Sequence, residues 1–131
     1  MNILITGGAG FIGSALVRYL LTNTDAHVIN IDKLTYAGNL ESIPLDMISK
    51  NYTFINCDIC DKNKLNDVFE KYSPNIVFHL AAESHVDRSI ESPEVFVKTN
   101  VLGTCNILNA SLKIYESKRD SSFFRFHHIS T

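Results

Sequence analysis

Four glycines within seven residues, directly after a short apolar run, restrict the possible fold more than any other feature. The run NILIT (residues 2–6) is typical of a buried strand, and GGAGFIG (residues 7–13) leads into a helical pattern. Such a turn needs glycine where φ is positive, where backbone approaches a ligand, and where a helix packs closely on a strand. The spacing of Gly7, Gly10 and Gly13 therefore predicts a turn that binds the pyrophosphate of a dinucleotide.

The start of the following helix adds donors to this phosphate site. Its first backbone N–H groups, near Phe11 and Ile12, have no partner inside the helix and lie at the positive end of the helix dipole. A triphosphate-binding loop would end in Gly-Lys followed by Ser or Thr, whereas this turn ends in Gly13-Ser14-Ala15. The turn thus favours a dinucleotide over a nucleoside triphosphate.

Short β-branched runs alternate with longer stretches of helical period along the chain. We expect strands at 2–6, 27–31, 52–56, 75–81 and 124–130, and helices near 11–22, 61–72 and 93–116. This alternation predicts an α/β fold, a Rossmann-type doubly wound parallel sheet with strand order 3-2-1-4-5 that stops after the fifth strand. With 131 residues, the chain fits one domain.

The helices supply two further expectations. The last one should begin at Pro93, with Ser92 as its N-terminal cap. The first should face the sheet with an apolar stripe made of Phe11, Ile12, Ala15, Leu16, Tyr19 and Leu20.

Composition argues against several classes of function. A formal net charge of −2 gives no overall attraction for nucleic acid or an anionic membrane, so we expect neither as a partner. No stretch approaches the ~20 apolar residues of a membrane span, and no signal-peptide core is present, which predicts a cytoplasmic protein. The Cys57-x-x-Cys60 pair has redox or zinc spacing but no second pair, so spare thiols are the simpler interpretation and no metal is expected.

Two aspartates follow predicted strands. Asp32 closes the second strand about 20 residues beyond the last glycine, where a carboxylate accepts hydrogen bonds from an adenosine ribose and repels a 2′-phosphate. This position favours NAD over NADP, although the neighbouring Lys33 is a cation; a surface turn residue is the alternative. Asp58 follows the third strand, where it either meets the adenine edge or only forms a turn.

The loop after the fourth strand combines small and charged residues. Ala81 and Ala82 leave room for a ligand between the first and fourth strands, where the strand order reverses. The polar residues that follow are Glu83, Ser84, His85, Asp87 and Arg88. No pair among them has a spacing diagnostic of catalysis, so a generic charged loop is the other interpretation.

Four segments carry a family resemblance. They are TGGAGFIG (6–13), DKLTYAGN (32–39), HLAAESHVDRS (79–89) and FHHIST (126–131). Together they resemble the dTDP-glucose 4,6-dehydratase family of extended short-chain dehydrogenases/reductases, and the similarity runs along the whole chain. The resemblance implies that residues 1–131 are an amino-terminal portion, a partial NAD-binding Rossmann domain without its substrate-binding part.

The resemblance also implies a place for individual side chains. The pyrophosphate would lie against Phe11 and Ile12, and the adenosine against Asp32, Lys33, Leu34, Thr35, Asp58 and Ile59. The path to the nicotinamide would be lined by Leu80, Ala81, Ala82, Ser84 and Thr99. The nucleotide-sugar pocket would be bordered by Ser84, His85, Val86, Asp87 and Thr131. Thr131 would be the catalytic residue, near the sugar's 4-hydroxyl; without the resemblance it is only a polar residue that ends a strand.

The implied reaction is the NAD-dependent dehydration of dTDP-glucose to dTDP-4-keto-6-deoxyglucose. A tyrosine base takes the 4-hydroxyl proton as NAD+ removes the C4 hydride, water leaves across C5 and C6, and the hydride returns at C6. That tyrosine needs a lysine four residues later, and none of the five tyrosines has one. The family's Asp-Glu pair and Tyr-x-x-x-Lys would follow Thr131. We therefore expect these residues to hold the cofactor without turnover, and the full-length protein to form a homodimer through the helix at 93–116.

Two other functions share the glycines and Asp32. One is a nucleotide-sugar epimerase or decarboxylase on the same fold, which is not expected to carry the same residues at 83–89. The other is a non-catalytic NAD-binding module. The sequence alone leaves both open.

Overall fold

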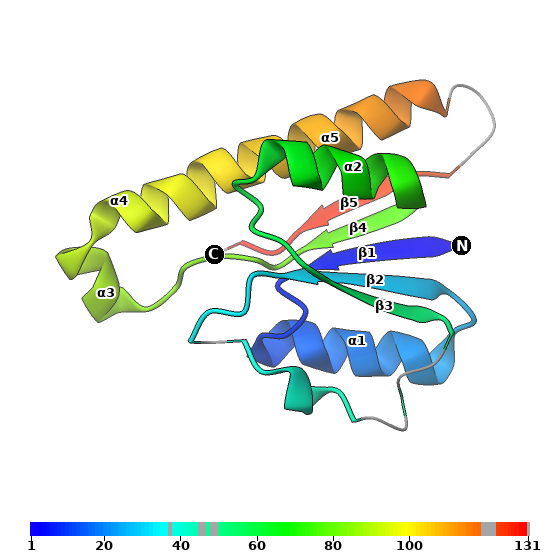
Figure 1. Cartoon of the computed structure of the whole chain (residues 1–131), viewed down its shortest axis with the longest axis horizontal. Coiled ribbons are helices and arrows are strands. Elements are labelled where there is room, and N and C mark those ends of the chain that lie inside the picture. The colour runs from blue at the N-terminus through cyan, green and yellow to red at the C-terminus, as the bar shows by residue number, and fades with distance from the viewer. Residues whose placement is uncertain (37, 45–46, 48–49, 119–122, 131) are drawn as a thin grey trace.

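One parallel sheet of five strands organises the chain (Figure 1). The computed structural model describes residues 1–36, 38–44, 47, 50–118 and 123–130. The strands follow the order β3-β2-β1-β4-β5, which confirms the predicted α/β architecture. They are β1 (Asn2–Thr6), β2 (His27–Asp32), β3 (Tyr52–Asn56), β4 (Ile76–His79) and β5 (Arg125–His128). The last two are shorter than predicted, because their apolar runs continue into Leu80 and Ile129, which line a pocket instead.

The helices differ from the prediction mainly in the last third of the chain. They are α1 (Phe11–Asn23), α2 (Lys62–Tyr72), α3 (Val86–Glu91), α4 (Pro93–Phe96), a π-helical segment (Val97–Gly103) and α5 (Thr104–Ser117), with a short 3-10 turn at Leu40–Ser42. The helix predicted at 93–116 is present as an uninterrupted helical stretch over 93–117, in which residues 97–103 take π-helical hydrogen bonds. Pro93 does begin α4, but the Ser92 side chain makes no capping hydrogen bond. Ser92 also ends α3, where its N–H donates to the Arg88 carbonyl.

Helix α1 packs on the sheet with a face that only partly matches the predicted one, sharing Leu16 and Leu20 with it. Its buried residues are Gly13, Ser14, Val17 and Leu20, spaced three and four apart. By contrast, Phe11 is 93% exposed, and most of the predicted stripe shares its exposure (Ile12, Ala15 and Tyr19). The predicted stripe was wrong for Phe11, Ile12, Ala15 and Tyr19, because close packing of the glycine turn brings Gly13 and Ser14 against the sheet and turns the first apolar residues outward.

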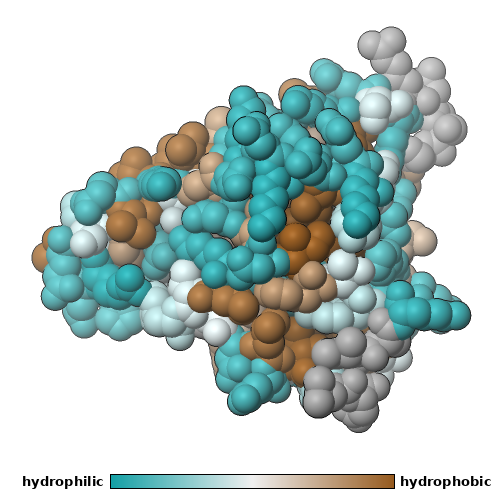
Figure 2. Space-filling view, viewed as in Figure 1, coloured by the Kyte–Doolittle hydropathy of each residue, from teal (hydrophilic) through white to brown (hydrophobic). Residues whose placement is uncertain are grey.

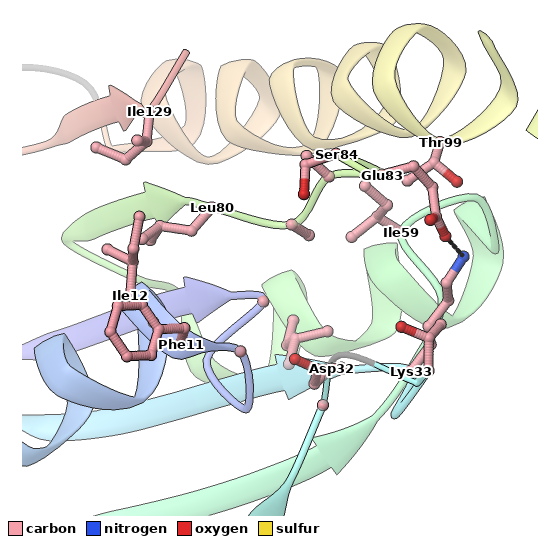
Figure 3. Close-up of a pocket in the computed structure, with 18 of the residues that line it drawn as sticks. Phe11, Ile12, Asp32, Lys33, Ile59, Leu80, Glu83, Ser84, Thr99 and Ile129 are labelled. Atoms are coloured by element: carbon pink, nitrogen blue, oxygen red, sulfur yellow. Dashed lines mark ion pairs between the residues drawn. The ribbon is translucent and has the colours of Figure 1, made fainter. Parts of the chain in front are cut away.

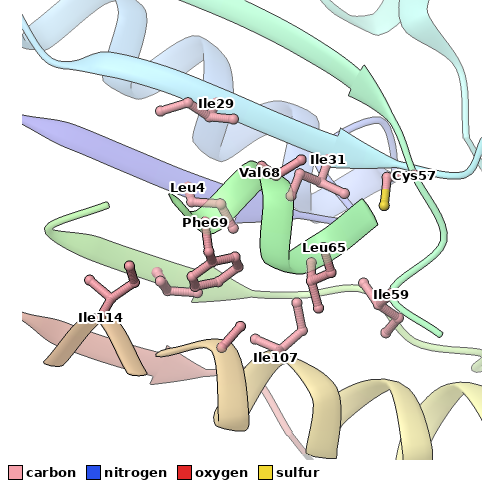
Figure 4. Close-up of a cluster of buried hydrophobic side chains, with 12 residues drawn as sticks. Leu4, Ile29, Ile31, Cys57, Ile59, Leu65, Val68, Phe69, Ile107 and Ile114 are labelled. Atoms are coloured by element: carbon pink, nitrogen blue, oxygen red, sulfur yellow. The ribbon is translucent and has the colours of Figure 1, made fainter. Parts of the chain in front are cut away.

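The helices cover the two faces of the sheet to different extents (Figures 1 and 4). On one face, α2 and α5 pack over a cluster that includes Leu4, Ile29, Ile31, Leu65, Phe69, Val77 and Ile107. On the other face, α1 packs over Ile3, Ile5, Val17, Leu20 and Val28. Ile76 and Phe78 of β4 point to this second face and stay half-buried. Among the described residues, no helix is long and apolar enough to cross a membrane.

Candidate functional site

A pocket of about 340 Å³ opens at the carboxyl ends of the strands, beside the point where the order reverses between β1 and β4 (Figure 3). Its walls come from the glycine turn, the end of β2, and the loops after β3 and β4. Thr99 of the π-helical segment and Ile129 after β5 complete the lining. Ligands of open α/β sheets bind at this kind of position.

The glycines of the turn meet three separate requirements. Gly7 has φ of 73°, and a Cβ atom there would lie 2.7 Å from the backbone nitrogen of Ala81. A Cβ at Gly13 would overlap the carbonyl oxygen of Gly7, so α1 can pack directly on the turn only with glycine there. Gly10 has more open surroundings, since a Cβ at that position would meet only the Gly7 oxygen, at 3.3 Å. Gly7 and Gly13 therefore shape the turn, and Gly10 leaves backbone accessible from the pocket.

The amino-terminal end of α1 presents backbone donors to the pocket. The first intrahelical hydrogen bond runs from the Ser14 N–H to the Gly10 carbonyl, over 2.9 Å. The N–H groups of Phe11, Ile12 and Gly13 precede that bond, and Gly10 has no side chain to cap them. All three residues line the pocket. This end of the helix therefore suits an anionic group such as a phosphate.

Asp32, the last residue of β2, lines the pocket with a carboxylate that two backbone donors hold in place. The Ala9 N–H donates to its Oδ2 at 3.0 Å, and the Leu34 N–H donates to its Oδ1 at 2.8 Å. Each oxygen keeps a lone pair for a further donor. The carboxylate is thus fixed in position and able to accept hydrogen bonds from ligand hydroxyl groups.

Charged side chains meet at one end of the pocket (Figure 3). The Lys33 Nζ lies 3.6 Å from Glu83 Oε1 and 3.8 Å from Asp58 Oδ2. The Glu83 side chain is only 6% exposed, whereas that of Asp58 is 39% exposed. These ion pairs connect the ends of β2, β3 and β4.

A buried polar network fixes β1 and β4 beside the pocket. The His79 imidazole contacts Thr6 Oγ1 through Nδ1 at 2.7 Å and Thr104 Oγ1 through Nε2 at 2.9 Å. The Ala81 N–H donates to the same Thr6 oxygen at 3.2 Å. Burial, together with the ring of His128 stacked 5.0 Å away, lowers the pKa of His79 to about 4. A neutral His79 therefore connects the sheet, α5 and the pocket loop at pH 7.

Most of the residues predicted to bind a cofactor line this one pocket. They are Gly7, Gly10, Phe11, Ile12, Gly13, Asp32, Lys33, Thr35, Ile59, Leu80, Ala81, Ala82, Ser84 and Thr99. Leu34 and Asp58 lie next to lining residues without lining the pocket themselves. The residues predicted for the sugar are less concentrated, since His85, Val86 and Asp87 are exposed outside the lining. Thr131 lies outside the described residues.

Five lining residues were not predicted to take part. They are Ile31, Gly38, Cys57, Glu83 and Ile129. Glu83 had a usable signal, because it stands between the predicted Ala82 and Ser84. Ile129 had none, since its place depends on β5 pairing with β4 and on its own N–H donating to the His79 carbonyl.

The cysteines do not form a metal centre in the part of the chain that the structure describes, where no group of three or more His, Cys, Asp or Glu side chains could hold an ion. Cys57, Cys60 and Cys105 are free thiols. Burial is the main reason that the pKa values of Cys57 and Cys60 are raised, so both stay protonated at pH 7.

Comparisons with known proteins agree with this geometry. The family described as GDP-mannose 4,6 dehydratase matches residues 4–131. A dTDP-glucose 4,6-dehydratase of Salmonella typhimurium is 55% identical over 135 residues, covering 100% of this chain and 37% of that protein. The chain thus spans a little over one third of the length of this relative.

Two solved structures with NAD bound also resemble this chain. A dTDP-glucose 4,6-dehydratase of Streptomyces venezuelae with NAD bound superimposes with a TM-score of 0.80 at 41% identity, over 88% of this chain and 37% of that one. A UDP-glucose 4-epimerase of Thermus thermophilus in complex with NAD gives a TM-score of 0.76 at 34% identity, over 88% and 35%.

Proposed function

The chain belongs to the GDP-mannose 4,6-dehydratase family, and on that premise we propose that it is the cofactor-binding part of an NAD-dependent dTDP-glucose 4,6-dehydratase. One observation carries the proposal: the glycine turn, the donors of α1 and the Asp32 carboxylate all face one pocket at the β1/β4 switch point. The 55% identity to a dTDP-glucose 4,6-dehydratase supports the choice of substrate.

The residues of the pocket fit a dinucleotide. The N–H groups of Phe11, Ile12 and Gly13 would bind the pyrophosphate, since they stand beside the accessible backbone of Gly10. Asp32 would accept hydrogen bonds from the adenosine ribose. Bound NAD would supply the hydride acceptor for the sugar's C4.

Apolar and small residues would enclose the rest of the cofactor. Thr35 and Ile59 would surround the adenosine, with Leu34 and Asp58 close by. Leu80 and Ile129 would exclude water along the path to the nicotinamide, where small side chains leave space and hydroxyl groups offer hydrogen bonds (Ala81, Ala82, Ser84 and Thr99).

The assignment of residues to the nucleotide sugar depends on the resemblance to the dTDP-glucose 4,6-dehydratase family. Ser84, His85, Val86 and Asp87 would border the nucleotide sugar, and Thr131 would meet its 4-hydroxyl. The 131 residues contain no Tyr-x-x-x-Lys, so we expect them to bind cofactor and not to convert dTDP-glucose. Formation of the 4-keto-6-deoxy product by this purified chain, followed by its absorbance in alkali, would contradict that expectation.

A homodimer of the full-length protein through the helix at 93–116 is part of the same proposal. Apolar side chains stand exposed on the π-helical segment and α5, among them Val97, Val101, Leu108, Leu112 and Tyr115. Figure 2 shows apolar surface along the helices from α4 to α5, at the upper left. Such a patch is typical of a protein interface.

A nucleotide-sugar epimerase is the second candidate, because an epimerase with NAD shares the fold at a TM-score of 0.76. Its identity to this chain is 34%, against 55% for the dehydratase of Salmonella typhimurium. Reading the gene beyond codon 131 separates them: Asp-Glu directly after Thr131 would support the dehydratase.

Calorimetric titration with NAD+ tests the cofactor site. We expect saturable binding by the wild-type chain and an affinity about tenfold lower for Asp32→Asn, which loses a charged acceptor. Asp25→Asn is the matched control, since Asp25 is an exposed carboxylate between α1 and β2, and it should bind like the wild type. Absence of heat from a natively folded wild-type chain would overturn the proposal.

A further inference from the structure

A cation stands beside Asp32, at the place where the 2′-phosphate of NADP would differ from the hydroxyl of NAD. Of the described residues that line the pocket, Lys33 alone carries a positive charge. A free lysine here would attract a 2′-phosphate and oppose the effect of Asp32. The preference between the two cofactors therefore depends on what else engages Lys33.

Two carboxylates engage it. Glu83 Oε1 lies 3.6 Å and Asp58 Oδ2 lies 3.8 Å from Lys33 Nζ, distances of ion pairs that are too long for good hydrogen bonds. Glu83 is the stronger partner, because its side chain is 6% exposed and charges interact more strongly away from water. Asp58, at 39% exposure, is screened by solvent.

The backbone of Glu83 is held on both sides by the side chain of Asn100. Its N–H donates to the Asn100 Oδ1 at 2.8 Å, and its carbonyl accepts from the Asn100 Nδ2 at 2.9 Å. Asn100 belongs to the π-helical segment, next to Thr99 of the pocket wall. These bonds fix the backbone position of Glu83, from which its carboxylate is directed at Lys33 (Figure 3).

We propose that Glu83, positioned by Asn100, is a specificity-determining residue that favours NAD over NADP by engaging Lys33. To bind a 2′-phosphate, Lys33 would have to leave Glu83 as a buried carboxylate without its cation, which is strongly unfavourable. The phosphate would also meet Asp32 and Asp58 nearby. The inference rests on the proposed NAD site and adds a second determinant to Asp32.

The test is calorimetric titration of NAD+ and NADP+ into wild type and Glu83→Gln at low salt. Glutamine keeps the shape of Glu83 but releases Lys33, so the ratio of the NADP+ dissociation constant to that of NAD+ should fall about tenfold. The double variant E83Q/K33Q should return the ratio to within about threefold of wild type, since the gain depends on the lysine. Glu94→Gln, which removes an exposed carboxylate of α4, should leave the ratio unchanged.

Each outcome decides the proposal. An unchanged ratio in Glu83→Gln, with NAD+ still bound, overturns the inference and leaves the proposed function standing. A gain that persists in E83Q/K33Q also overturns it, because a general change of field and not Lys33 would then be responsible. A folded wild-type chain that binds neither nucleotide overturns both. If Glu83→Gln does not fold, Asn100→Ala, which removes both hydrogen bonds to the Glu83 backbone, should lower the ratio by about threefold, and no change there would contradict the proposal.

Discussion

The two faces of the sheet differ in how far their helices reach. On the α2/α5 face, the buried cluster extends from Ile29 of β2 to Val77 of β4, and Phe126 of β5 packs against it. On the α1 face, burial is complete over β1 and β2 and incomplete over β4, where Phe78 is half-buried. Of the described residues of β5, Arg125 and His127 are exposed on this same face, and the His127 ring lies against Phe78.

This difference in burial between the strands matches the two halves of the pocket. The glycine turn and Asp32, which we assign to the pyrophosphate and adenosine, stand on β1 and β2, the strands that both faces bury. Leu80 and Ile129, which we assign to the nicotinamide path, follow the two strands with an open face. The adenosine half of the site is therefore the more rigidly supported half.

The largest expected effect contrasts two phenylalanines. Phe69→Ala on the covered face should lower the free energy of unfolding by about 3–5 kcal/mol, because Phe69 is 1% exposed and its removal leaves a cavity. Phe78→Ala on the open face should cost roughly 1 kcal/mol, since part of its ring already meets water. Urea unfolding measures both.

Two less disruptive substitutions test the same contrast in case an alanine variant does not fold. Phe69→Leu should still cost more than Phe78→Leu. Equal losses at the two positions would mean that the α1 face is as well covered as the other, and the comparison would fail.

The second effect is a pH dependence of stability from His79, whose burial relies on the covered face. Its pKa of about 4 lies below the ordinary 6.5, so between these values the unfolded chain binds a proton that the folded chain does not. The free energy of unfolding should therefore fall as the pH drops from 6.5 to 4, by roughly 3 kcal/mol in full.

A variant isolates this contribution from that of the carboxylates. His79→Asn should be less stable at pH 7 and should lose most of the additional slope between pH 6.5 and 4. His85→Asn removes an exposed imidazole and should keep the slope. An identical slope in wild type and His79→Asn would contradict the assignment.

The third effect separates two glycines of the turn. Gly7→Ala should destabilise the chain by about 2 kcal/mol, because alanine is strained at φ of 73° and its methyl group would press on the Ala81 backbone. Gly10→Ala should cost less than about 1 kcal/mol, since its φ of −77° suits any residue, and should weaken NAD+ binding instead. Thermal unfolding and titration with NAD+ distinguish the two; a Gly7→Ala variant as stable as Gly10→Ala would contradict the assignment.

Features encoded by local patterns were predicted well. The alternation of runs located all five strands, and the glycine spacing located the turn, because both depend on neighbouring residues. The strand order followed from the general topology of doubly wound sheets. Features that depend on tertiary packing were predicted less well. Apolar residues occur on both sides of α1, so periodicity alone could not show that Gly13 and Val17 are buried and Phe11 is exposed.

The same reasoning explains the part of the site that was missed. Glu83 is brought to Lys33 by the hydrogen bonds of Asn100, 17 residues away, and Ile129 reaches the pocket through the pairing of β5 with β4. The position of Glu83 between the predicted Ala82 and Ser84 was a local signal for its place in the pocket. Its contact with Lys33 and the place of Ile129 left no local pattern in the sequence.

Backbone amide NMR during titration with NAD+ tests the central claim most directly. The account predicts that the largest shifts fall on Phe11, Ile12 and Gly13, with smaller ones at Asp32, and that Asn66 and Glu70, which line a separate hollow between α2 and α5, do not move. A folded chain in which the amides of residues 11–13 stay still, or in which α2 responds most, would contradict it.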